Sequence, residues 1–156
     1  MSNSATIREL GPHDTGAAYR VMASLRELSS EIEFVTRVNE LQRLEGYRVI
    51  GSFEDGDSTC VSVAGFRVAH NLAWGSFLYV DDLATLPERR GRGHAGALVA
   101  WLHHEAARLG CDEVHLDSGT HRHGAHRFYF GQGMHVSSFH FSVEPQARPR
   151  GAGESP

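Results

Sequence analysis

The segment Pro87-Glu88-Arg89-Arg90-Gly91-Arg92-Gly93-His94-Ala95-Gly96 places three arginines and three glycines just before an apolar run with helical spacing. Glycine has no Cβ, so successive backbone N–H groups can converge on a ligand there. The first turn of a helix adds unpaired N–H donors and a partial positive charge. Together these features predict a site for an anion, with phosphate as the favoured ligand.

Before this segment, the hydrophobic pattern predicts one strand, two helices and then three more strands. The helices carry apolar residues at spacings of three and four, whereas the strands alternate with a period of two. Asp55-Gly56 is a strong hairpin signal, so the three strands should form an antiparallel meander. The predicted ranges are Thr6–Leu10, the helices Asp14–Leu28 and Glu31–Leu44, and the meander strands Tyr47–Phe53, Thr59–Ala69 and Ser76–Leu86.

After the segment, the pattern predicts a helix, a strand, a short helix and a final strand. Their ranges are Gly93–Leu109, Glu113–Asp117, Gly124–Gly131 and Met134–Val143. A strand that returns after a helix crossover lies parallel to the strand before it. The order β-α-α-β-β-β-α-β-α-β therefore predicts an α/β fold with a mixed sheet, antiparallel at its start and parallel in the middle. We expect one domain over residues 1–143 and a disordered tail over 144–156.

The composition argues against several classes of protein. The chain has 156 residues and a formal net charge of −4, so we expect no nucleic-acid partner. The sequence contains no apolar run long enough to cross a membrane and no recognisable signal peptide, which makes a cytoplasmic location the expectation. Cys60 and Cys111 lie far apart, and the eleven histidines lack metal-ligand spacing, so we expect no metal site.

The glycines also fit a second class of phosphate ligand. Gly91–Gly96 satisfies the G-x-G-x-x-G pattern of dinucleotide-binding folds, and Asp117 ends the next predicted strand, where a ribose-binding acid would stand. In those folds the glycines follow a strand directly, whereas Pro87–Arg90 intervenes here. An antiparallel meander precedes the motif, and the chain after it is too short for a doubly wound sheet. The order of elements therefore disfavours a dinucleotide.

A resemblance to a known family selects a different ligand. Arg90–Ala95 resembles the Q/R-x-x-G-x-G/A motif of the GNAT superfamily of acyl-CoA-dependent N-acyltransferases. Upstream, Tyr79–Glu88 is similar to the family's strand and Pro-Glu turn. Downstream, Ala125–Met134 looks like its A-x-x-x-Y-x-x-x-G-F segment, with methionine in place of the last phenylalanine. With the matching order of elements, the resemblance covers Thr6–Val143.

This resemblance implies a binding mode for acetyl-CoA as the acyl donor. The backbone of the glycine-rich turn would hold the pyrophosphate, and the arginines would supply charge-assisted hydrogen bonds. The pantetheine arm would lie between Ser76–Leu86 and Glu113–Asp117, pairing with the first of these strands like an added strand. The residues expected to contact acetyl-CoA are Leu83, Thr85, Arg90, Gly91, Arg92, Gly93, His94, Ala95 and Gly96.

The resemblance also implies roles in catalysis. Tyr129 matches the family tyrosine that protonates the departing thiolate, although a packed aromatic residue would give the same pattern. Asp81 matches a carboxylate that accepts the amine proton in polyamine acetyltransferases, here through a bridging water. Asp81 would otherwise attract a cationic substrate or hydrogen-bond the backbone. Strict strand alternation puts Asp81 and Asp82 on opposite faces of the sheet, and His115 and His121 are alternative bases.

The expected activity is therefore transfer of an acetyl group from acetyl-CoA to a primary amine of a small molecule. Glu31, Glu33 and the Asp81–Asp82 pair hint at a cationic amine. Arg122 stands where many members of the family have an asparagine that contacts the cofactor, and it could instead reach a phosphate or a substrate carboxylate. Two alternatives remain, a non-catalytic acyl-CoA sensor or partner module and a peptide or protein N-acetyltransferase. The sequence leaves the oligomeric state open, and the edge offered by the predicted strand His135–Val143 would suit a homodimer.

Overall fold

A computed structural model describes residues 5–54 and 58–146 of the chain. Its centre is a five-stranded sheet in the order β1-β2-β3-β4-β5. The first four strands pair antiparallel with their neighbours, whereas β5 pairs parallel with β4. The strands are β1 (Thr6–Glu9), β2 (Arg48–Phe53), β3 (Cys60–Asn71), β4 (Gly75–Thr85) and β5 (Glu113–Leu116). The predicted mixed α/β sheet is thus confirmed.

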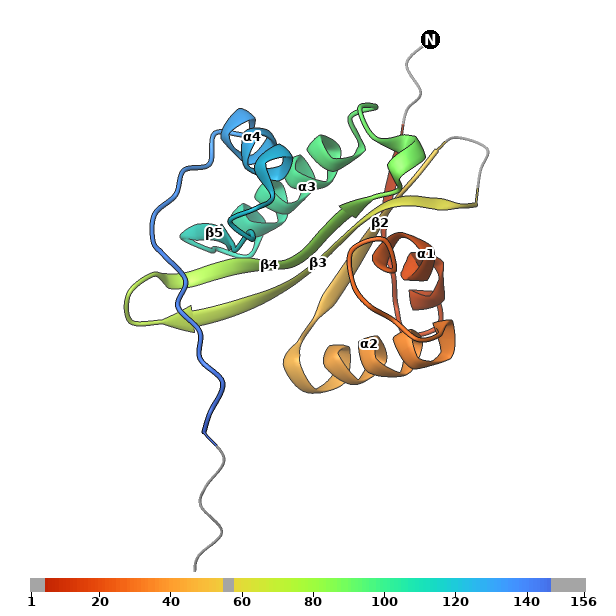
Figure 1. Ribbon diagram of the computed structural model, residues 1–156, viewed down its shortest axis with the longest axis horizontal. Coiled ribbons are helices and arrows are strands. Elements are labelled where there is room, and N and C mark those ends of the chain that lie inside the picture. Colours follow the sequence, from red (N-terminus) through yellow and green to blue (C-terminus); the bar gives the residue numbers. More distant parts are fainter. Residues whose placement is uncertain (1–4, 55–57, 147–156) are drawn as a thin grey trace, which may run out of the picture.

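Helices cover both faces of this sheet (Figure 1). One face carries a short 3-10 turn, η1 (Thr15–Ala18), with α1 (Tyr19–Met22) and α2 (Glu31–Glu45). The other carries α3 (His94–Arg108), while α4 (His123–Gly131) lies beyond β5 on that side. A further 3-10 turn, η2 (Pro87–Arg89), leads from β4 toward α3. The parallel β4–β5 pair is therefore joined by α3, as the sequence predicts.

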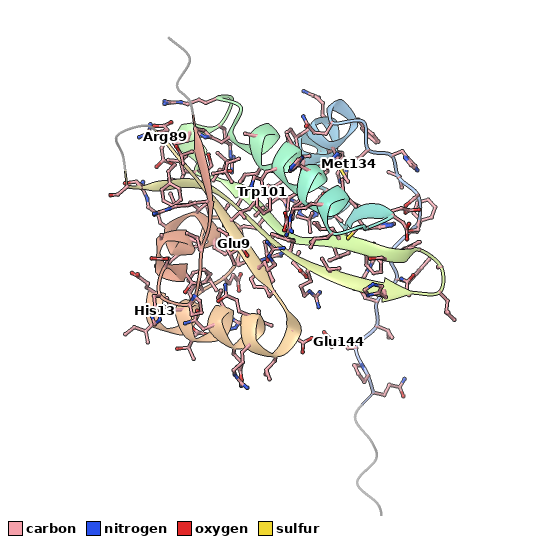
Figure 2. All side chains as sticks on the ribbon, turned by 180° about the vertical axis from the view of Figure 1, so that it is seen from behind. Glu9, His13, Arg89, Trp101, Met134 and Glu144 are labelled. Atoms are coloured by element: carbon pink, nitrogen blue, oxygen red, sulfur yellow. The ribbon has the colours of Figure 1, made fainter. Side chains whose placement is uncertain are left out.

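Two apolar cores form where the helices meet the sheet. Val21 and Phe34 lie in the core beneath α1 and α2, together with Val49 and Val63 of the strands. On the opposite face, α3 buries its apolar stripe against β2, β3 and β4. Figure 2 shows Trp101 on this helix, and its ring packs edge-on against Phe66 at 5.9 Å between centroids. The sheet is thus buried on both faces in its middle and leaves its ends available for a site.

The two N-terminal helices differ in how well the sequence predicts them. The bounds of α2 agree with prediction because its ends carry clear signals. Ser30 accepts a hydrogen bond from the Glu33 N–H at 3.1 Å, and Gly46 closes the helix at φ 65°. The predicted helix Asp14–Leu28 is wrong, because only η1 and the four-residue α1 form there. After α1 the Ser24 hydroxyl donates to the Val21 carbonyl at 2.6 Å, which competes with helix continuation.

The predicted final strand Met134–Val143 is also wrong. Residues 134–146 form no regular secondary structure, and β5 is the last strand in the described sheet. Gly133, at φ 81°, follows α4, and from there the chain runs away from the helices and past the β3–β4 hairpin (Figure 1). Phe139, Phe141 and Val143 are consequently 83–90% exposed. The alternating pattern of this segment does not produce a strand, because the segment pairs with no strand edge in the described sheet.

Two further predictions fall mainly beyond what the structure describes. The Asp55-Gly56 hairpin turn and most of the predicted disordered tail lie outside the described residues, although β2 and β3 do pair antiparallel on either side of the turn. Among the described helices, none has the length and apolar character that crossing a membrane requires.

Candidate functional site

A β-bulge in β4 sets the geometry of the candidate site. Gly65 of β3 pairs with Asp82, and Phe66 pairs with Val80, so Asp81 is the extra residue on β4. Gly65 itself is required here, because a Cβ at that position would lie 1.8 Å from the Tyr47 hydroxyl oxygen. The bulge bends β4 just where its pairing with the next strand stops.

The pairing of β4 with β5 extends from Phe77–Glu113 to Val80–Leu116 and then ends. Within the described sheet, the stretch Asp81–Thr85 of β4 has a neighbour on the β3 side alone. The two parallel strands therefore diverge after four residue pairs. Unpaired backbone groups on a diverging strand are the kind of edge to which an extended ligand adds itself as a strand.

The bulge also changes which way the two aspartates face. Val80 and Leu83 both pack in the core beneath α3. In a regular strand these two residues, three positions apart, would lie on opposite faces of the sheet. The extra residue resolves this conflict by placing Asp81 and Asp82 together on the α1–α2 face. Arg26 contacts both, donating from Nε to Asp82 Oδ1 at 2.8 Å and from a terminal nitrogen to the Asp81 carbonyl at 2.9 Å. The expectation that they face opposite sides is therefore wrong.

Each of these carboxylates is held by partners that the sequence did not reveal. Arg67 makes a bidentate ion pair with Asp81, at 2.7 and 2.9 Å. Asp82 accepts a hydrogen bond from the Tyr47 hydroxyl at 2.6 Å as well as that from Arg26. Burial, more than the adjacent aspartate, raises the pKa of Tyr47, so its hydroxyl remains a donor. The acidic pair is thus compensated by this chain's own cations and hydroxyl.

A groove of about 440 Å³ opens beside the diverging strands. It draws residues from the segment after α1, from β4, from the end of β5 and from α4. The lining residues are Ser24, Leu25, Arg26, Val80, Asp81, Leu83, Leu116, Asp117, Gly119, His121, Arg122 and Tyr129. The groove therefore contains both predicted catalytic residues, Asp81 and Tyr129, and one of the predicted acetyl-CoA contacts, Leu83.

Tyr129 is partly buried on α4, at the side of this groove. Burial raises the pKa of its hydroxyl, while the positive charge of Arg122 lowers it by a smaller amount. The phenol is therefore protonated at neutral pH and able to donate a proton. Among the described residues, no side chain or backbone group hydrogen-bonds to this hydroxyl, which argues against a purely structural role.

The two alternative bases lie in different surroundings. His121 lines the groove. His115 instead stacks on Trp74 with 3.9 Å between ring centroids, and its Nε2 lies 2.6 Å from a Glu113 carboxylate oxygen. The geometry therefore keeps His121 as an alternative proton acceptor and gives His115 a packing role.

The glycine-rich turn has the backbone shape that an anion site needs. Gly91 and Gly93 adopt φ values of 73° and 86°, in the left-handed region that favours glycine. The first helical hydrogen bond of α3 is donated by Ala97 to the Gly93 carbonyl at 3.0 Å. Within the described residues, the N–H groups of 91–96 donate to no backbone carbonyl. Consecutive donors at a helix N-terminus form a cradle for phosphate.

The side chains of the turn divide into two groups. Arg89 and Arg92 both pair with the buried carboxylate of Glu54, the second at 3.5 Å. His94 is also buried, with its ring nitrogens 3.0 Å from the Ser52 hydroxyl and 3.2 Å from Glu54. These side chains fix the turn to Ser52 and Glu54 on its inner side.

The remaining predicted contacts are Arg90 in the turn, Ala95 and Gly96 at the start of α3, and Thr85 on β4. Arg90 is exposed and makes no ion pair with any described residue, so its guanidinium is available to a ligand. Ala95 and Gly96 contribute the first turn of α3. Thr85 lies further back on β4, where its hydroxyl is 2.7 Å from that of Ser62. The bracing residues of the sheet, Ser52 and Glu54, carry no sequence signal, because only the fold brings β2 under the turn.

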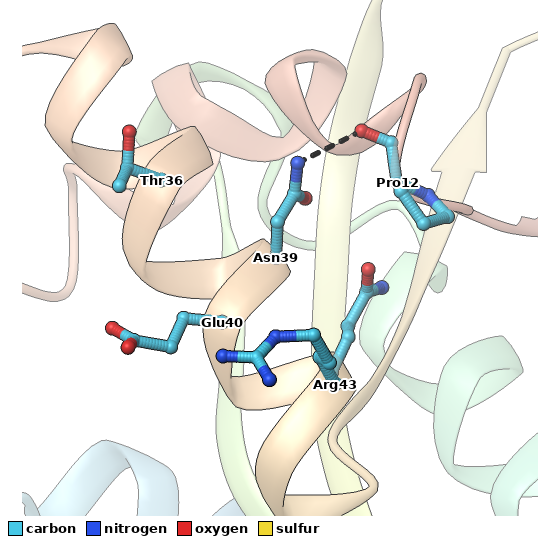
Figure 3. A pocket seen from close by; sticks show the side chains of 6 residues that line it. Pro12, Thr36, Asn39, Glu40 and Arg43 are labelled. Carbon is cyan, nitrogen blue, oxygen red and sulfur yellow. Dashed lines mark hydrogen bonds between the residues drawn. The ribbon is translucent and has the colours of Figure 1, made fainter.

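A second hollow, of about 620 Å³, lies over α2 (Figure 3). It is lined by Pro12 and by polar residues of the helix, and Asn39 Nδ2 donates to the Pro12 carbonyl across it at 3.0 Å. None of its lining residues belongs to the predicted site or to the groove at Tyr129. It therefore contributes nothing to the chemistry considered below.

Comparison with known families identifies the class of enzyme, an acyltransferase. The sequence profile of the acetyltransferase (GNAT) family matches residues 18–134. The chain belongs to this family, and the resemblance drawn from its three motifs is confirmed.

Known proteins similar to this chain carry related descriptions. An aminoalkylphosphonate N-acetyltransferase of Salmonella typhimurium is 35% identical over 63 residues, which cover 40% of this chain and 41% of that protein. An uncharacterized N-acetyltransferase of Bacillus subtilis, YhdJ, is 29% identical over 80% of this chain and 87% of its own length. The solved aminoglycoside N-acetyltransferase AAC(6')-Iy in complex with CoA has a TM-score of 0.81, 14% identity, and coverage of 92% of this chain and 96% of its own.

Proposed function

We propose that this protein transfers an acetyl group from acetyl-CoA to a primary amine of a small molecule. The observation that carries the proposal is that the β4–β5 divergence leads from the glycine-rich turn to a groove holding Tyr129 and Asp81. Two similar proteins support the class of acceptor, since one is described as acting on aminoalkylphosphonates and another on aminoglycosides. The CoA bound to the second supports the class of donor.

The proposed binding mode uses the free donors of the turn. The pyrophosphate would accept hydrogen bonds from the backbone N–H groups of Gly91 to Gly96, and the unpaired Arg90 would add a charge-assisted bond. The pantetheine arm would then follow β4 along Leu83 and Thr85, on the side that β5 has left. This route ends in the groove, so the thioester would meet the acceptor beside Tyr129.

The proposed chemistry is direct transfer. The amine nitrogen forms a bond to the thioester carbonyl carbon, and the carbon–sulfur bond breaks. The phenol of Tyr129 gives its proton to the departing thiolate, and the proton of the attacking amine passes through a water to Asp81. The bidentate ion pair with Arg67 fixes the position of the Asp81 carboxylate on the bulge. His121 is the alternative acceptor within the same groove.

The experiment follows release of free thiol from acetyl-CoA with a panel of small primary amines, and mass spectrometry identifies the acetylated product. We expect stoichiometric thiol release and acetyl amide with at least one small amine. Tight binding of CoA without turnover on any amine would favour a non-catalytic acyl-CoA sensor instead. Turnover restricted to peptides would favour the protein N-acetyltransferase alternative.

We further infer a homodimer. The segment that the sequence predicts as a strand is irregular within one chain, and we infer that it pairs with a second copy. Phe139, Phe141 and Val143 alternate with polar residues and are exposed, while the outer edge of β5 has no described neighbour. A second copy offers both complementary parts, because each chain supplies one segment and one edge. Light scattering should give twice the mass of one chain, and Phe139→Ser with Phe141→Ser should give monomers. A wild-type monomer at high concentration would contradict this inference.

A further inference from the structure

The groove at Tyr129 is lined by two arginines and two aspartates, namely Arg26, Arg122, Asp81 and Asp117. Both carboxylates already have partners. Asp81 has its bidentate ion pair with Arg67, and Asp117 accepts the Tyr79 hydroxyl and lies 3.4 Å from a ring nitrogen of His140. Arg26 is likewise engaged with Asp82 and the Asp81 carbonyl.

Arg122 is the exception. Its side chain makes no hydrogen bond or ion pair with any other described residue. Its backbone is nevertheless fixed, because the Arg122 N–H donates to Gly119 at 3.0 Å and its carbonyl accepts from His126 at 3.1 Å. The residue therefore stands at the N-cap of α4 in a defined place, with an exposed guanidinium that lines the groove and pairs with no described side chain.

This guanidinium is near the reacting end of the groove. Tyr129, seven residues further along, lines the same groove, and the charge of Arg122 acts on its hydroxyl by lowering its pKa against the effect of burial. Arg122 is thus close enough to influence the proposed acid, yet it forms no bond with it.

The balance of charge decides what kind of acceptor fits. A cationic acceptor would have to compete with Arg67 for Asp81, and with the Tyr79 hydroxyl for Asp117. An anionic group, in contrast, would meet a guanidinium with all its donors free, and arginine binds carboxylates and phosphates in a bidentate manner. The hint of a cationic amine rested on Glu31, Glu33 and the Asp81–Asp82 pair, and of these the two aspartates already pair with Arg67 and Arg26.

We propose that Arg122 binds an anionic group of the acceptor, so that the substrate is a small molecule carrying an amine and a carboxylate, phosphonate or phosphate. This inference rests on the proposed function, since it names the class of acceptor for the same groove. Arg122 would act as a specificity-determining residue, which positions the acceptor by its acidic end and leaves its amine toward Asp81 and Tyr129.

The test compares four amines built on the same three-carbon chain. These are 3-aminopropylphosphonate, 3-aminopropanoate, propylamine and 1,3-diaminopropane. A charge-assisted hydrogen bond contributes about 1.5–3 kcal/mol, which corresponds to roughly 10–150-fold in affinity. We expect kcat/KM to be higher by about that factor for the two anionic amines than for propylamine. Preference for 1,3-diaminopropane would overturn the proposal.

Two variants complete the test. Arg122→Gln should remove the preference for anionic amines by raising their KM toward that of propylamine, and it should leave acetyl-CoA affinity within about twofold. Arg127→Gln is the matched control, because Arg127 lies on the same helix, is exposed and does not line the groove. A loss of acetyl-CoA affinity in Arg122→Gln, with the amine preference intact, would assign Arg122 to the donor and overturn the proposal.

Failure of the proposed function has a different signature. Calorimetry on the CoA-bound protein measures binding of 3-aminopropylphosphonate without requiring turnover. Binding that Arg122→Gln weakens, without acetylation of any amine, would sink the catalytic proposal and keep the assignment of Arg122. Equal binding by wild-type protein and Arg122→Gln would overturn the assignment itself.

Discussion

Replacing Gly93 by valine tests the glycine-rich turn as a phosphate cradle. Gly93 caps α3 at φ 86° and ψ 0°, and an added Cβ would meet no atom within 4 Å. The cost of the substitution is therefore conformational rather than steric. A side chain in the left-handed region costs about 1–2 kcal/mol, and a β-branched residue lies at or above the upper end. The turn has either to retain this strain or to relax and withdraw its N–H donors.

Both outcomes have measurable consequences. Calorimetric titration with CoA should show affinity reduced about tenfold or more, since about 1.4 kcal/mol corresponds to a factor of ten. The thermal midpoint should fall by about 2–8 °C, because a domain of this size loses roughly 2–4 °C per kcal/mol.

Gly110→Val is the matched control for this prediction. Gly110 lies at the other end of α3, adopts φ 71° and also has open space around an added Cβ. It should lose a similar amount of stability and keep the CoA affinity of the wild type. If Gly93→Val and Gly110→Val bind CoA equally well, the assignment of the turn as the phosphate site is refuted.

Other predictions address the groove and the fold. Tyr129→Phe should lower kcat by about 10²–10⁴-fold with little change in CoA affinity, and a normal kcat in this variant would remove Tyr129 from the acid role. Because burial raises the pKa of Tyr129, wild-type activity should show no loss from ionisation of this hydroxyl below pH 10. Asp81→Asn should lower kcat, since an amide accepts no proton, whereas Asp82→Asn should keep it; an unchanged kcat in Asp81→Asn would exclude Asp81 as the base. Hydrogen bonds from Arg108 and Arg48 lower the pKa of Glu105 to about 2, so the Glu105 carboxylate stabilises the fold above about pH 4.5 and loses that effect as pH falls toward 2. The difference in unfolding free energy between wild type and Glu105→Gln should therefore shrink between about pH 4.5 and pH 2. A constant difference would contradict the ion pairs.

Much of the fold follows from signals local in sequence. Ser30 and Gly46 mark the ends of α2, and Gly91 and Gly93 of the turn adopt positive φ values that glycine favours. The helix predicted over 14–28 is wrong, although its apolar spacing is helical, because the Ser24 hydroxyl bonds to the backbone and ends the helix there. The segment Met134–Val143 alternates like a strand, yet a strand needs a partner edge, and sequence alone does not supply one.

The decisive feature of the site lies beyond such local signals. The bulge at Asp81 is a feature of the register between β3 and β4, and the Tyr47 side chain lies against Gly65 beside it. Both contacts join residues far apart in the chain. The sequence therefore identified Asp81 as a candidate but assigned its neighbour to the wrong face, and it gave no sign that Arg67 holds the carboxylate.

A crystal structure of the protein with bound CoA tests the central claim most directly. The account predicts the pyrophosphate on the backbone N–H groups of Gly91–Gly96 and the pantetheine arm hydrogen-bonded to β4 between Asp81 and Thr85. The sulfur should lie in the groove, within hydrogen-bonding reach of the Tyr129 hydroxyl. CoA bound elsewhere, for example in the hollow over α2, or a sulfur directed away from Tyr129, would contradict the account.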